Sequence, residues 1–458
     1  MRTISPLLRA LPLGRTLLLA AALALPACAD AGSAGPDAGP LTTSDAGTDL
    51  HPDGGVAPPH ITVSVDTTPY QDVVVVHHDA DGRFLATVPL SPDGEGRIDA
   101  PSPGAMVTVL AFDGSTRFLA TVADVRPDET LRFGEPDFGR VEVSAVLPPM
   151  PPAATSAYRL HVGCGTAFGQ LGNTRITSSV SARCLDGDGI SATVAAQDDD
   201  ARLLAYVTAL DLPDVGSSPV DLSGEAWRYE LGRVRLHVGN LDPGQARATV
   251  TSFRGASRLA VDTVRTSVAA GAGLDATLGM AALEADQWEL TLALSTTWML
   301  RETSVRSDEV PVSGSLTIIE RDATVLLMDA FDVAVPWPLS TVSVDASGTP
   351  ACEIAGAADM ATFGTRALGD DGWYHWNIAV PGDVLGLSYP ELGPLAEVWW
   401  PVEAFSMGLT DVRYVAHSAL DYAALRQDVL IEDPIDVHAP GRGEATCTAT
   451  VELGASAS

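Results

Sequence analysis

The sequence predicts an all-β protein made of tandem antiparallel β-sandwich domains. Apolar and polar residues alternate with a period of two, most clearly over residues 288–295 and 233–238. Turn signals such as Asp81-Gly82 and Asp113-Gly114 separate the predicted strands. Alternation of this kind is typical of antiparallel strands that bury one face and expose the other. One short helix is expected, over residues 418–427, with Ser418 as its N-cap.

Length and charge limit what the protein can be. At 458 residues the chain exceeds the roughly 250–300 residues at which a single core stops growing, so several domains are expected. The 59 acidic residues outnumber the 27 basic ones and give a net charge of −32. Such an acidic chain argues against a nucleic-acid partner and against charge-driven adhesion to anionic membranes.

The first 27 residues are predicted to be a signal peptide. Arg2, Arg9 and Arg15 precede a run of nine apolar residues at 17–25. Nine apolar residues are too few to cross a bilayer core, which needs about 20. The stretch therefore directs export rather than spanning a membrane.

The cleavage region, Leu25-Pro-Ala-Cys28, resembles the lipobox of bacterial lipoproteins. The resemblance implies that the thiol of Cys28 is diacylated and that Cys28 becomes the first residue of the mature protein. Pro26 departs from the family pattern, so an ordinary secretory signal with an incidental cysteine is the alternative. Ala29 resembles the residue that follows the cysteine in outer-membrane lipoproteins. We therefore expect a lipid anchor at the outer membrane or cell surface, with a periplasm-facing position also open.

Residues 28–59 are predicted to form a disordered tether. Asp-Ala-Gly recurs at Asp30, Asp37 and Asp45 in a stretch rich in Gly and Pro. Low hydrophobicity and one sign of charge prevent such a segment from burying a core. It resembles the tethers that follow the lipobox in predicted lipoproteins of myxobacteria, and its root-mean-square reach is roughly 30 Å.

Four β domains are predicted after the tether, over 60–136, 137–215, 216–345 and 346–458. In the first, Arg83-Phe-Leu-Ala-Thr-Val88 recurs verbatim at 117–122. With only two copies, this indicates two similar hairpins in one sandwich rather than a repeat array. The strand and turn pattern of 77–109 resembles carboxypeptidase-regulatory-like and Ig-like modules, which implies an Ig-like sandwich.

The four cysteines after Cys28 are even in number and belong to an exported chain, so disulfides are expected. Three pairings are possible, and we favour the local one, Cys164–Cys184 with Cys352–Cys447.

Aromatic residues gather in the last predicted domain, at 373–376 and 399–400. If 373–378 is a strand, Trp373 and His375 share one face while Tyr374 and Trp376 share the other. One face must be core, and the other is either a platform for a sugar or protein partner or ordinary packing. The predicted partner-binding residues are Trp373, His375, Trp376, Trp399 and Trp400.

Signals for metals and catalysis are weak. His77 and His78 are adjacent in a predicted strand and point to opposite faces, so they do not form one metal site. The sequences at 79–82 and 186–189, Asp-x-Asp-Gly, share a fragment with calcium loops but lack the closing Glu. We therefore predict no metal site and no cofactor, with weak calcium binding as the alternative to solvated turns. No GxSxG, HExxH or P-loop motif occurs.

The expected function is a non-catalytic binding or structural role of a cell-envelope lipoprotein that displays β-sandwich modules to a protein or glycan partner. The alternative is a surface-anchored hydrolase without a recognisable motif.

Overall fold

The computed structural model describes residues 58–452, apart from 69, 135–139, 151, 182–184, 186–189, 213–218, 256, 335–340, 402–405 and 430–442. The predicted signal peptide, Cys28 and all but the last two residues of the predicted tether lie outside the described residues. Within them strands dominate and the helices are four residues or fewer, so the predicted all-β class is confirmed. No helix in the described part is long and apolar enough to cross a membrane.

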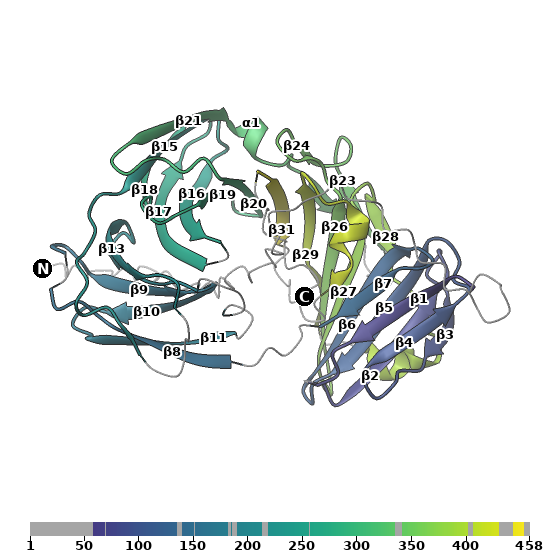
Figure 1. Cartoon of the computed structure of the whole chain (residues 1–458). Helices are drawn as coiled ribbons and strands as arrows, with labels where there is room; N and C mark the ends of the chain where they lie inside the picture. The colour runs from purple at the N-terminus through teal and green to yellow at the C-terminus, as the bar shows by residue number, and fades with distance from the viewer. Residues whose placement is uncertain are drawn as a thin grey trace, which may run out of the picture.

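A twelve-stranded sheet runs through most of the molecule (Figure 1). Every neighbouring pair is antiparallel except β27 and β6, which are parallel. The sheet joins strands from three of the four predicted domains. In sheet order they are β17 (Ser257–Val268), β16 (Gly244–Arg254), β19 (Gln287–Ser295), β20 (Met299–Ser307), β31 (Ala445–Glu452), β29 (Ser406–His417), β26 (Met360–Gly369), β27 (Gly372–Pro381), β6 (Thr116–Val125), β5 (Ala105–Phe112), β2 (Asp72–His78) and β3 (Phe84–Val88).

Small sheets complete the sandwiches against this large sheet, with apolar side chains between the layers. The alternating pattern of Val234, Leu236 and Val238 puts these three side chains fully in a core that they share with Val250 and Leu292. The small sheets are β30 (Asp428–Val429), β7 (Thr130–Phe133), β1 (His60–Val65) and β4 (Glu95–Asp99); β18 (Leu274–Met280), β15 (Gly232–Gly239) and β21 (Leu316–Asp322); β22 (Asp332–Ala334), β23 (Thr341–Asp345) and β28 (Gly386–Ser388); and β24 (Ala351–Cys352) with β25 (Gly356–Ala357).

A separate sandwich contains residues of the second predicted domain and has its own core (Figure 1). One of its sheets packs against the edge strand β17, where Asp262 accepts hydrogen bonds from Nε and Nη2 of Arg202, each at 3.0 Å. Its strands are β10 (Gly165–Gln170), β9 (Ala157–Val162), β12 (Ala192–Gln197) and β13 (Leu203–Ala209) in one sheet and β11 (Arg175–Ser181), β8 (Arg140–Val146) and β14 (Val220–Asp221) in the other.

The helix predicted at 418–427 is shorter and starts later than expected. α3 spans Tyr422–Leu425, and its N-cap is Asp421, whose side chain accepts from the N–H of Ala424 at 3.0 Å. Ser418 Oγ accepts from the N–H of Ala445 instead, and His417 Nδ1 accepts from the N–H groups of Ala419 and Leu420. These contacts hold residues 418–420 outside the helix. The other helices are α1 (Ala323–Leu326), α2 (Ala396–Trp399) and the 3₁₀ turn η2 (Gly393–Leu395).

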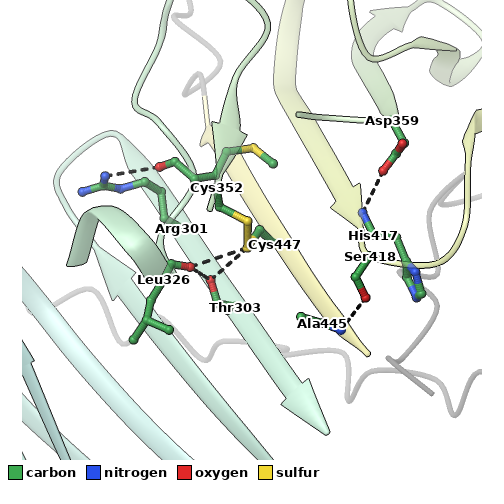
Figure 2. The surroundings of a disulfide bond; sticks show 10 residues. Arg301, Thr303, Leu326, Cys352, Asp359, His417, Ser418, Ala445 and Cys447 are labelled. Carbon is green, nitrogen blue, oxygen red and sulfur yellow. Dashed lines mark hydrogen bonds between the residues drawn. A yellow bond between two sulfur atoms is a disulfide. The ribbon is translucent and has the colours of Figure 1, made fainter. Parts of the chain in front are cut away.

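The predicted disulfide between Cys352 and Cys447 is confirmed (Figure 2). It links β24 to β31 across 95 residues of sequence, next to Thr303 of β20. Cys164 is also disulfide-bonded. Cys184 lies outside the described residues, so the pairing Cys164–Cys184 stays a prediction.

Candidate functional site

The aromatic strand β27 alternates as its sequence predicts. Tyr374 and Trp376 are each 3% exposed and face the largest core, whereas Trp373, on the opposite face, is 41% exposed. His375 is half-buried on the same face as Trp373. The inner face of this strand is therefore core.

The inner face and the segment 389–400 form an aromatic cluster. The ring of Trp376 lies 5.1 Å from that of Trp400 and 5.3 Å from that of Tyr389, both edge to face. Tyr374 meets Trp400 in the same way at 6.2 Å. Edge-to-face contacts between aromatic rings are favourable beyond the area they bury. Trp399, 3% exposed, belongs to the core beneath this cluster.

A small pocket opens at the cluster, with a volume of about 210 Å³. It lies at the seam where β27 of the last predicted domain pairs with β6 of the first. Only two of the five predicted binding residues line it. The lining residues are Trp376, Tyr389, Pro390, Leu392, Ala396 and Trp400, and we call this the seam pocket.

A chain of buried hydrogen bonds fixes Trp376 from behind. Its indole Nε1 donates to Thr121 Oγ1 at 2.9 Å, Thr121 lies 2.8 Å from Thr108 Oγ1, and Thr108 lies 2.9 Å from His78 Nε2. An indole N–H can only donate, so Trp376 is the donor to Thr121, and onward donation through Thr108 to His78 is one arrangement that satisfies every bond. That direction requires a neutral His78. Burial, the largest cause, and the neighbouring His77 lower the pKa of His78 to about 4, which keeps the ring neutral at pH 7.

The outer face carries the other two predicted residues. The guanidinium carbon of Arg366 lies 5.4 Å from the centre of the Trp373 ring. His375 packs against Phe118 with ring centres 5.5 Å apart, and burial together with Arg366 lowers its pKa to about 4. Of the five predicted residues, Trp376 and Trp400 therefore line the pocket, Trp399 lies in the core, and Trp373 and His375 lie on the outer face.

A second, larger pocket of about 770 Å³ lies at the turn between β19 and β20. Trp298, 43% exposed, stands in it beside the ion pair of Arg301 with Asp242. Sequence reasoning missed this pocket, although the run Ser295-Thr-Thr-Trp298 between two strands was a signal for an exposed aromatic turn. Its other lining residues are Pro243, Gly244, Gln245, Ser295, Thr296, Thr297, Met299 and Ala330.

In the acidic turns within the described residues, Asp carboxylates accept hydrogen bonds from backbone N–H groups of the same turn. Asp79 Oδ1 accepts from the N–H groups of Asp81 and Arg83 at 3.0 and 2.9 Å. Asp198 does the same for Asp200 and Arg202. The turn 186–189 lies outside the described residues. Among the described residues, no three His, Cys, Asp or Glu side chains are grouped so that they could hold a metal ion.

No protein-family model and no curated protein matches this sequence. Among solved structures, the Bacillus anthracis TIE protein aligns at 8% identity and a TM-score of 0.14, over 58% of this chain. The aligned part spans half the length of the TIE protein. A tetra-tandem repeat from the extending region of a large adhesion protein aligns at 12% identity and a TM-score of 0.12, over 87% of this chain and all of that one.

Proposed function

We propose that this protein is a cell-envelope lipoprotein with a non-catalytic binding role, and that the seam pocket is a contact site for its partner. The observation that carries the proposal is an open pocket walled by three aromatic rings, Trp376, Tyr389 and Trp400. Concave sites with mostly apolar and aromatic walls are the usual form of ligand pockets. Its size suits one sugar ring or one apolar side chain of a partner protein.

The support for rigid presentation comes from the hydrogen bonds around the pocket. Trp376 is held by Thr121 of the neighbouring strand, and Glu391 N–H donates to the carbonyl of Gly82 at 2.8 Å. Phe84 packs against Gly393, where a Cβ would lie 2.6 Å from the ring. These contacts hold the segment 389–400, which completes the pocket, in place before a partner binds. Binding therefore costs little conformational entropy in the pocket.

The support for anchoring comes from the sequence. The lipobox-like Cys28 and the acidic tether behind it would hold the sandwiches at a membrane surface and leave the pocket accessible. Metabolic labelling with a fatty acid should mark the wild-type protein and not a Cys28→Ala variant. Labelling that persists in the variant would overturn the lipid anchor at this residue.

The pocket is tested on residues 58–458 produced without lipid. We expect glycan-array or partner-capture signals that fall about tenfold or more in Trp400→Ala, because a half-buried aromatic wall is removed. Trp298→Ala, in the other pocket, is the matched control and should leave capture unchanged. Equal capture by wild type and Trp400→Ala would contradict the proposal. Hydrolytic turnover of ester, peptide or glycoside substrates would contradict the non-catalytic role.

A further inference from the structure

Arg159 and Arg258 lie where the separate sandwich meets β17, and Arg265, further along β17, is close enough for its charge to lower the pKa of Arg159. Arg159 comes from β9, and Arg258 and Arg265 come from β17. The backbone of Arg258 bonds to the carbonyl of Gly163 at 2.8 Å, and its Nη1 donates to Thr166 Oγ1 at 3.3 Å. Arg159 and Arg258 are half-buried and Arg265 is exposed. This basic cluster lies away from the seam pocket, on other strands.

The arginines of the basic cluster form no ion pair within the described residues, and the carboxyl group near Arg258 is that of Glu289. Burial and the repulsion of Arg258 and Arg265 lower the pKa of Arg159 to about 10. No ion pair to any of the three occurs among the described residues. The charge of Arg258 lowers the pKa of the nearby Glu289 carboxyl group, but burial of Glu289 raises that pKa by more. In a chain with 59 acidic and 27 basic residues, three arginines without an ion pair among the described residues are unexpected.

Buried donors in the same place lack acceptors. Nε of Arg159 and Nε of Arg258 are buried and have no hydrogen-bond partner within the described part of the chain. A buried donor that stays unpaired is unfavourable for the folded state. His161 adds no further positive charge, because burial and the two arginines hold its pKa well below the ordinary value and keep it neutral. An anion bound beside the exposed Arg265 would offset the charge of the cluster.

An exposed aromatic ring borders the basic cluster. Phe168, opposite Arg159 in the β9–β10 pair, is 67% exposed, and the Arg159 guanidinium carbon lies 4.7 Å from its ring centre. Guanidinium groups bind carboxylate and sulfate through two parallel hydrogen bonds, and aromatic rings stack on the apolar faces of sugars. The net charge of −32 disfavours a densely charged nucleic acid, whereas a sugar bearing separated charges needs only the local cations.

We infer that Arg159, Arg258 and Arg265 bind the carboxylate or sulfate groups of an acidic saccharide, whose ring stacks on Phe168. The inference does not depend on the seam pocket.

Isothermal titration calorimetry on residues 58–458 tests this inference, with a heparin tetrasaccharide, inorganic sulfate and maltotetraose as probes. We expect the heparin tetrasaccharide to bind, maltotetraose not to bind, and the affinity to fall as salt rises. Arg265→Gln, at an exposed position that should not disturb folding, and Arg159→Gln should each weaken binding about tenfold. Phe168→Ala should weaken the tetrasaccharide and leave sulfate binding unchanged.

The matched control is Arg235→Gln, which removes an exposed arginine that is paired with Asp275 elsewhere in the molecule. Equal losses in Arg235→Gln and Arg265→Gln would show a general charge effect and overturn the inference. Equal binding of the acidic and neutral saccharides would also overturn it. Tighter arginine-dependent binding of a poly-Glu peptide than of the tetrasaccharide would assign the basic cluster to an acidic protein partner and reject the saccharide.

Discussion

At the scale of single residues, the buried chain from Trp376 to His78 makes stability depend on pH. The pKa of His78 is about 4 in the folded protein, against an ordinary value of 6.5, because burial disfavours its charged form. Between these values the unfolded chain binds more protons than the folded one. Stability should therefore fall as the pH is lowered from 6.5 towards 4.

The measurement is the melting temperature at several pH values from 4 to 7, for wild type and His78→Gln. The melting temperature of the variant should fall less than that of wild type as the pH is lowered, since the variant has no imidazole to protonate beside Thr108. His161 and His375 also have lowered pKa values and contribute in both proteins, so only the difference between them reports on His78. Identical pH profiles would show that His78 does not control this transition.

The residue scale also shows which part of the site the sequence could predict. The two faces of β27 followed from alternation alone, since the strand period is two. The partner of Trp376, however, is Thr121, which is 255 residues away in sequence. Likewise Tyr389 and Trp400 reach the pocket through a loop with no periodic pattern. Periodicity predicts which way a side chain points, but not which distant residues it meets.

At the scale of elements, one hexapeptide occurs in two strands with different surroundings. In β3, at the edge of the large sheet, Leu85 is 49% exposed. In β6, between β27 and β5, the equivalent Leu119 is fully buried. The local sequences are identical, so neighbouring strands alone decide the burial of each leucine. This limits what a repeat can predict about structure.

Leu119→Ala and Leu85→Ala are therefore a matched pair of variants. We expect Leu119→Ala to lower the free energy of unfolding by about 2–5 kcal/mol, through lost burial and the remaining cavity. Leu85→Ala should change it by about 0.5 kcal/mol or less, as expected for a surface site. Chemical denaturation measures both values. Similar losses in the two variants would mean that β3 is covered rather than at an edge.

At the scale of the whole molecule, the sequence predicted sandwiches but not their fusion into one sheet. The pairs β20–β31 and β27–β6 join chain segments far apart in sequence. Backbone hydrogen bonds between such strands require no particular side chain, so neither composition nor periodicity predicts them. The predicted boundaries of the four domains stay predictions, because the largest core draws residues from three of them.

Arg426 links a segment near the end of the chain to the first predicted domain, through its ion pairs with Glu129 and Asp124. It is fully buried at the end of α3, 2.5 Å from Glu129 and 3.7 Å from Asp124. Arg426→Met should lower the free energy of unfolding by about 3 kcal/mol, because two carboxylates lose their buried partner. The control is Arg97→Met, which breaks an exposed pair with Asp99 and should change stability by about 0.5 kcal/mol or less. Equal effects in denaturant titrations would reject the role of Arg426.

Fusion of the sheet predicts how fragments behave. Residues 346–458 contain β26, β27, β29 and β31, but their core also needs Leu119 and Met299 from elsewhere in the chain. This fragment should show no cooperative melting transition by circular dichroism or calorimetry, because the outer edges of β27 and β31 and half of the core interface lose their partners.

Residues 140–230 are the matched control fragment. Every residue of the core between its two sheets lies between 141 and 227, so the fragment keeps that core after excision and should melt cooperatively. Its losses lie at the contact with β17, where Leu203 and Tyr206 pack against Leu259 and where Arg202 bonds to Asp262. Cooperative melting of 346–458 near the temperature of residues 58–458 would show that the fused sheet links independent domains. Failure of 140–230 to fold would show that even this sandwich needs β17 as a support.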